Sequence, residues 1–150
     1  MQQQGEFTTR VIVSDITPAT VAGSRFGYQV TVTGGSQDAG LLEAARAAIL
    51  AHGGRTETDA PPVLMAEFGS QLLTRLLGAF LAPARFWPMR MVCEVLPGEQ
   101  PTLRLTASEA FGFGSLIGVE GRFRTRCQAL LTDVSRDVYA NLERARVSAS

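Results

Sequence analysis

Two adjacent segments carry apolar faces that fit one another, and this pairing constrains the fold more than any other feature. Residues 86–107 alternate between apolar and polar side chains on both sides of a turn, which is typical of an antiparallel hairpin with one buried face. Residues 121–142 carry apolar side chains at three- and four-residue steps, which is the spacing of an amphipathic helix. Because a half-buried sheet needs a cover, we expect this helix to lie across the hairpin.

The register of the hairpin follows from the positions of its apolar residues. With residues 97–101 as the loop, the apolar positions of both strands fall on one face. The facing pairs are then Val95 with Leu103, Cys93 with Leu105 and Met91 with Ala107. The same register sets Glu94 opposite Arg104 on the outer face, where an exposed ion pair contributes less than about 1 kcal/mol. A shift by one residue would move Arg104 into the apolar row.

The order of elements predicts the fold class. Strand candidates occur at residues 7–13, 26–33, 63–68 and in the hairpin, and residues 55–62 read as a polar, proline-ended loop. We therefore expect an α+β fold, a two-layer sandwich with a mainly antiparallel sheet of about four to five strands. Its cover consists of helices 38–52 and 119–145, with an additional amphipathic segment at 70–82.

The chain is expected to form one domain over residues 1–150, with residues 1–5 and 146–150 frayed. The element order is similar to that of helix-grip and lipoprotein-type sandwich domains, where a long C-terminal helix backs a curved antiparallel sheet. This similarity implies the layer arrangement alone, because no motif in the chain identifies a family.

Composition excludes several classes of function. All 14 basic residues are arginine and they balance 14 acidic residues, so no net field attracts nucleic acid. The absence of lysine excludes Schiff-base catalysis, a lysine general base and a P-loop lysine. Hydrophobic residues make up 45% of the chain and charged residues 19%, which favours a partner surface or an apolar pocket.

The residues of metal and thiol chemistry are few. His52 is the only histidine, and its place just before Gly53 gives it a structural role at the C-terminal end of a helix. Cys93 and Cys127 fall on the apolar faces, where thiols are expected to be buried core residues, although a disulfide between hairpin and helix is geometrically conceivable. We therefore predict no metal ion and no cofactor.

Two further patterns are candidates for catalytic sites. The glycines of residues 112–121 follow a strand and precede a helix, but their spacing differs from that of dinucleotide-binding loops, which favours a simple turn. Glu67 and Glu109 have no visible partner and would need a cavity to act in acid–base chemistry. No residue is therefore assigned a catalytic role, and we do not expect an enzyme.

The strongest functional candidate is residues 70–91. Leucine and phenylalanine pairs recur every four residues, arginines are the only charged residues between Glu67 and Glu94, and Trp87 follows. We predict that the domain holds an apolar or lipid-like ligand in a pocket between sheet and helices. The predicted lining consists of Leu72, Leu76, Phe80, Trp87, Met89 and Met91.

Two alternatives remain open beside a purely structural role for the 70–83 stripe as a third core helix. One is a self-associating module, a homo-oligomer built through residues 70–91 or through the open edge of the N-terminal strand. The other is a peripheral protein that binds the membrane surface with residues 70–87. The longest apolar stretch ends at Pro83, short of the roughly 20 residues of a transmembrane span. The N-terminus lacks a secretory signal, so the cytoplasm or the inner face of the membrane is the expected location.

Overall fold

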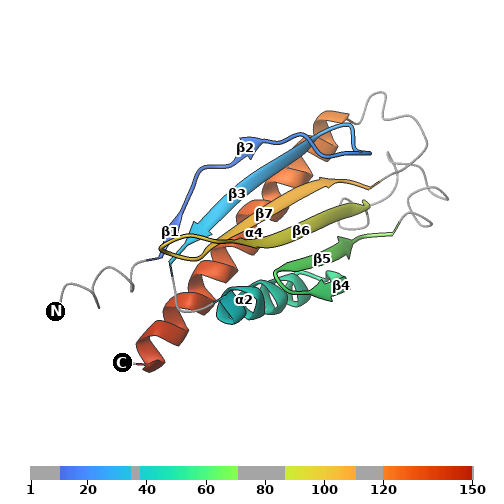
Figure 1. The fold of residues 1–150 in the computed structure, drawn as a ribbon. Coiled ribbons are helices and arrows are strands. Elements are labelled where there is room, and N and C mark those ends of the chain that lie inside the picture. The colour runs from blue at the N-terminus through green and yellow to red at the C-terminus, as the bar shows by residue number, and fades with distance from the viewer. Residues whose placement is uncertain (1–10, 35–37, 71–86, 111–119, 150) are drawn as a thin grey trace.

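One antiparallel sheet and two helices make up the part of the chain that the structure, a computed structural model, describes (Figure 1). The described residues are 11–34, 38–70, 87–110 and 120–149. The strands are β1 (Ile12–Val13), β2 (Thr17–Pro18), β3 (Gly27–Thr33), β4 (Arg55–Ala60), β5 (Val63–Phe68), β6 (Met89–Leu96) and β7 (Thr102–Glu109). The helices are α2 (Asp38–Ala51) and α4 (Glu120–Ala149). The predicted α+β sandwich is confirmed.

The sheet brings together strands that are far apart in the sequence. Its strand order is β1-β3-β7-β6-β5-β4, and β2 also pairs with β3. All these pairings are antiparallel. Because β3 lies beside β7, residues near the N-terminus are brought next to the end of the hairpin, an arrangement that positions the site described below.

The predicted hairpin register is confirmed in full. Val95 pairs with Leu103, Cys93 with Leu105 and Met91 with Ala107. Glu94 pairs with Arg104, and their side chains form an ion pair in which Arg104 Nη2 lies 2.6 Å from Glu94 Oε1. The alternation of polar and apolar residues was sufficient to set the register because the described helices cover one face of the hairpin and select apolar side chains there.

The prediction of a loop at residues 55–62 is wrong for most of that segment. Residues Arg55–Ala60 form β4, which pairs with β5 and shifts register between Thr56 and Thr58. The described sheet therefore has seven strands, more than the four to five expected. An edge strand is held by backbone hydrogen bonds to one neighbour and needs no apolar face of its own, so a polar sequence can form one.

Both helices lie on one face of the sheet, which we call the inner face. Helix α4 packs across β3 and β7, whereas α2 packs against α4 and the strands β4, β5 and β6 (Figure 1). Helix α4 runs to Ala149 and so includes most of the tail that was expected to fray. The inner face and the helices share one buried core, in which the largest fully buried side chains are Phe123, Leu41, Ile49, Leu64, Met89, Met91, Leu103, Leu105, Leu130 and Leu131.

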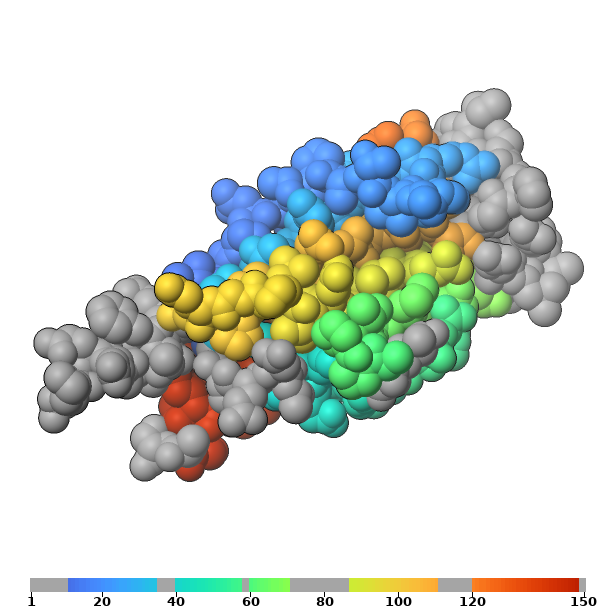
Figure 2. All heavy atoms as spheres, in the orientation of Figure 1, coloured from blue at the N-terminus to red at the C-terminus, as the bar shows by residue number. Residues whose placement is uncertain are grey.

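The opposite, outer face of the sheet carries no described helix. Figure 2 views the molecule from this side, with β3, β7, β6 and β5 across the front. Along β6 the burial alternates strictly, so Met89, Met91 and Cys93 are buried while Arg90 and Val92 are half-buried. On β5, β6 and most of β7 the outer face therefore presents partly exposed side chains, whereas Ser108 near the end of β7 is buried.

Candidate functional site

Three of the six predicted site residues lie together in the core. Trp87, Met89 and Met91 are 4%, 0% and 0% exposed, and Met89 and Met91 project from the inner face of β6. Leu72, Leu76 and Phe80 lie outside the described residues, as do the rest of segment 71–86 and the glycines at 112–118. The structure thus brings half of the predicted lining together.

An aromatic stack links the start of β6 to the start of α4. The rings of Trp87 and Phe123 are 4.6 Å apart between centroids, with 17° between their planes. Phe123 belongs to the first turns of α4, and its side chain is fully buried. The backbone N–H of Ala110 donates to the carbonyl of Pro88 at 2.9 Å, which ties the end of β7 to the same place. We call this region the Trp87 end of the core.

A carboxylate is buried at the Trp87 end. Glu109 is 3% exposed and pairs across the strands with Met89, so its side chain projects to the inner face. Among the described residues it is the one charged residue in the buried class. A carboxylate placed in apolar surroundings needs hydrogen-bond donors to offset its lost hydration.

Those donors come from the segment just before β3. The backbone N–H of Arg25 donates to Glu109 Oε1 at 2.8 Å, and the Arg25 guanidinium lies 3.5 Å from Oε2. The Ser24 hydroxyl donates to the backbone carbonyl of Glu109 at 2.9 Å. This partnership has no signal in the sequence, because Arg25 and Glu109 are 84 residues apart and meet through the pairing of β3 with β7.

Both cysteines are core thiols, as predicted. Cys93 and Cys127 are free and buried. Burial raises the pKa of Cys93 to about 12, and burial assisted by the nearby Glu109 carboxylate raises the pKa of Cys127 to about 12. Since the thiolate is the nucleophilic form, neither side chain is suited to covalent catalysis near neutral pH.

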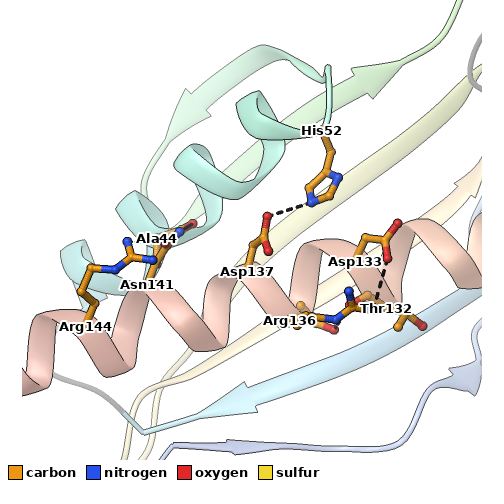
Figure 3. Close-up of polar contacts among 9 residues, drawn as sticks. Ala44, His52, Thr132, Asp133, Arg136, Asp137, Asn141 and Arg144 are labelled. Carbon is orange, nitrogen blue, oxygen red and sulfur yellow. Dashed lines mark hydrogen bonds and ion pairs between the residues drawn. The ribbon is translucent and has the colours of Figure 1, made fainter.

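The other polar candidates have structural partners. Glu67, expected to lack one, forms an ion pair with Arg90 at 3.3 Å on the outer face. His52 Nε2 lies 2.8 Å from Oδ2 of Asp137 on α4, as Figure 3 shows, so the histidine joins the two helices. These contacts account for both side chains without a catalytic role.

The described ranges contain neither a candidate metal cluster nor a candidate membrane-spanning helix. No group of three His, Cys, Asp or Glu side chains there is arranged to hold a metal ion. None of the described helices combines the length and apolar character needed to cross a bilayer.

The Trp87 end therefore combines an aromatic stack, a methionine and a buried carboxylate. These side chains offer apolar contact surface and, at Glu109, carboxylate oxygens that accept hydrogen bonds. The sequence matches no protein-family model, and no curated protein is significantly similar to it.

Proposed function

We propose that this domain is a non-enzymatic binding protein that takes an apolar or lipid-like molecule between the sheet and α4, at the Trp87 end. The observation that carries the proposal is the buried Glu109 carboxylate at the same end of the core as the Trp87–Phe123 stack. A buried ionisable group next to large adaptable side chains is a frequent property of ligand sites.

The carboxylate defines the polar part of the ligand. A hydroxyl or amine at the head of an apolar chain would donate to Glu109 and compete with the donors of Arg25. Because Arg25 lies in the short segment before β3, its displacement would open this end without disturbing the hairpin. The apolar chain would then separate Trp87 from Phe123 and contact Met89.

Trp87 provides the test because it is the only tryptophan in the chain. Tryptophan emission is followed while the protein is titrated with oleyl alcohol or with oleate, below the concentration at which either aggregates. We expect a saturable change in emission, stronger for the alcohol, since the carboxylate of oleate would face Glu109 with a like charge. Native mass spectrometry of the same samples should show a one-to-one complex.

Matched variants locate the site. Phe123→Leu removes the stacking partner and should weaken binding, whereas Val138→Ala alters the same buried face of α4 well away from Trp87 and should leave affinity unchanged. The proposal fails if neither probe changes the emission and only empty protein is detected. It fails equally if both variants affect binding to the same extent.

The self-association alternative has one observation in its favour. Ile12 and Val13 of β1 are 55% and 37% exposed at the edge of the sheet, where a second strand could add. The membrane alternative has less support, because Trp87 would have to leave its stack with Phe123 to reach a lipid surface. The two free cysteines suit a reducing compartment, so we propose the cytoplasm as the location.

A further inference from the structure

The outer face of β5, β6 and β7 carries charged and apolar residues in a regular order. Cross-strand pairing arranges them in three parallel rows. The rows are Glu67–Arg90–Ser108, Met65–Val92–Thr106 and Val63–Glu94–Arg104. The middle row is uncharged, and each outer row contains one ion pair: Glu67 with Arg90 at 3.3 Å and Glu94 with Arg104 at 2.6 Å.

Strand β6 runs through the centre of this surface, with a positive side chain towards its start and a negative side chain towards its end. Its successive outward residues are Arg90, Val92 and Glu94, which are positive, apolar and negative. Reversing the direction of the strand about Val92 therefore exchanges the positions of the positive and the negative charge.

We propose that a second copy of this chain docks face to face on this surface. The two copies are related by a two-fold axis that lies between the two sheets and parallel to them, at right angles to the strands and directly over Val92. Arg90 of each copy then opposes Glu94 of the other. On each side of the axis the charges alternate in sign across the interface. Glu67 and Arg90 of one copy lie next to Glu94 and Arg104 of the second. Val92 and Met65 meet their own counterparts at the centre.

The pattern selects a second copy because an isologous interface must be self-complementary. A rotation axis parallel to the strands would set Arg90 against Arg90, so the charges also select the orientation. Aligned packing of two sheets, with strands within about 30° of each other, is a common way to cover such a face. At one corner of this face, a Cβ on Gly27 of β3 would lie 2.7 Å from Val21 Cγ2, and Ser108, which pairs with Gly27, is buried, so this corner lies outside the docking surface.

This surface lies on the side of the sheet opposite α4, so dimer formation is independent of the proposed ligand site at the Trp87 end. It also differs from the edge of β1, whose pairing would leave Val92 uncovered. A substitution at Val92 should therefore affect the face-to-face dimer and leave a dimer paired through the edge of β1 unchanged.

The first experiment compares two added charges by sedimentation equilibrium of the full chain over a wide dilution series. Val92→Glu places two carboxylates against each other on the axis and should abolish the dimer. Leu50→Glu adds the same charge at an exposed leucine of α2, on the helical side, and should leave the dimer intact. A monomer at every concentration of the unmodified chain overturns the proposal, as does a dimer that survives Val92→Glu.

The second experiment does not depend on how Val92→Glu folds. The fourfold variant Glu67→Arg, Arg90→Glu, Glu94→Arg, Arg104→Glu reverses both ion pairs, so it keeps the attraction within each chain and across its own dimer. Mixed with the unmodified chain, it opposes like charges at positions 90 and 94. Native mass spectrometry should show the two homodimers with the mixed dimer strongly depleted. Mixed dimers at their statistical share would place the interface elsewhere, for example at the β1 edge, and overturn the proposal.

Discussion

His52, the residue directly after α2, bonds to Asp137 in the middle of α4, with 2.8 Å between Nε2 and Oδ2. One turn further along α4, the Asn141 amide donates to the Ala44 carbonyl of α2 at 3.2 Å. Residues four apart share a helix face, so these two bonds form one polar seam between the helices (Figure 3). The seam sets how the covering layer is aligned, while the apolar contacts beneath it supply most of the stability.

The first prediction concerns the strength of this seam. Because both side chains are partly exposed, His52→Ala and Asp137→Ala should each lower the free energy of unfolding by less than about 1 kcal/mol at neutral pH. Urea denaturation of the two single variants and the double variant gives their coupling energy. Arg136→Ala, which removes a contact to Asp133 within α4 alone, is the control and should show no coupling to His52. Strict additivity of His52→Ala and Asp137→Ala would contradict the assignment.

The second prediction uses two glycines in different surroundings. A Cβ at Gly54 would lie 2.5 Å from Ile49 Cγ2 and 2.7 Å from the Phe68 ring, whereas nothing lies within 4 Å of one at Gly121. Gly54→Ala should therefore destabilise the fold by about 1–3 kcal/mol through overpacking. Gly121→Ala, at the start of α4, should be neutral or stabilise by up to about 1 kcal/mol. Thermal and urea unfolding measure both, and equal effects of the two substitutions would contradict the packing described around Gly54.

Segments with one buried and one exposed face could be predicted from the sequence because solvent and core select different side chains at alternate positions. The register of the hairpin and the start of α4 follow from this contrast, whereas α4 continues to Ala149, past the predicted end at residue 145. Strand β4 was not predicted because it lies at the edge of the sheet and is held there by backbone pairing with β5. Side-chain patterns carry little information about such a strand.

The candidate site was predictable in its apolar part alone. Trp87 and Met89 stand in a segment whose pattern indicates a buried face, and the structure places both at one end of the core. The partnership of Arg25 with Glu109 depends on which strands become neighbours, and a strand order with β3 beside β7 has no local signal in the chain.

The third prediction follows from the raised pKa values of the two thiols. Both thiols stay protonated in the folded state up to about pH 12, whereas in the unfolded chain they titrate near 9.0. Below about pH 9 the thiols therefore do not change the free energy of unfolding. Between about pH 9 and pH 12 each thiol lowers the free energy of unfolding by about 1.4 kcal/mol per pH unit, because it ionises in the unfolded chain alone. Urea midpoints measured over this alkaline range should show the loss.

The Cys93→Ala/Cys127→Ala double variant isolates the contribution of the thiols. It should be less stable at neutral pH, because buried atoms are lost, and its stability should fall less steeply in alkali. An unchanged alkaline slope in the double variant would show that other groups cause the decline.

The fourth prediction separates the hydrogen bond of Glu109 from its charge. Glu109→Ala removes the side-chain acceptor of the part-buried Arg25 N–H bond and should lower the free energy of unfolding by about 1–3 kcal/mol. Glu109→Gln keeps an oxygen in the same place and should cost less. Hydrogen exchange at Arg25 should accelerate in the alanine variant and stay slow in the glutamine variant, while Glu94→Ala, at an exposed ion pair on the outer face, should leave it unchanged. Equal protection of Arg25 in both Glu109 variants would mean that the side chain is not the acceptor that holds this segment against the sheet.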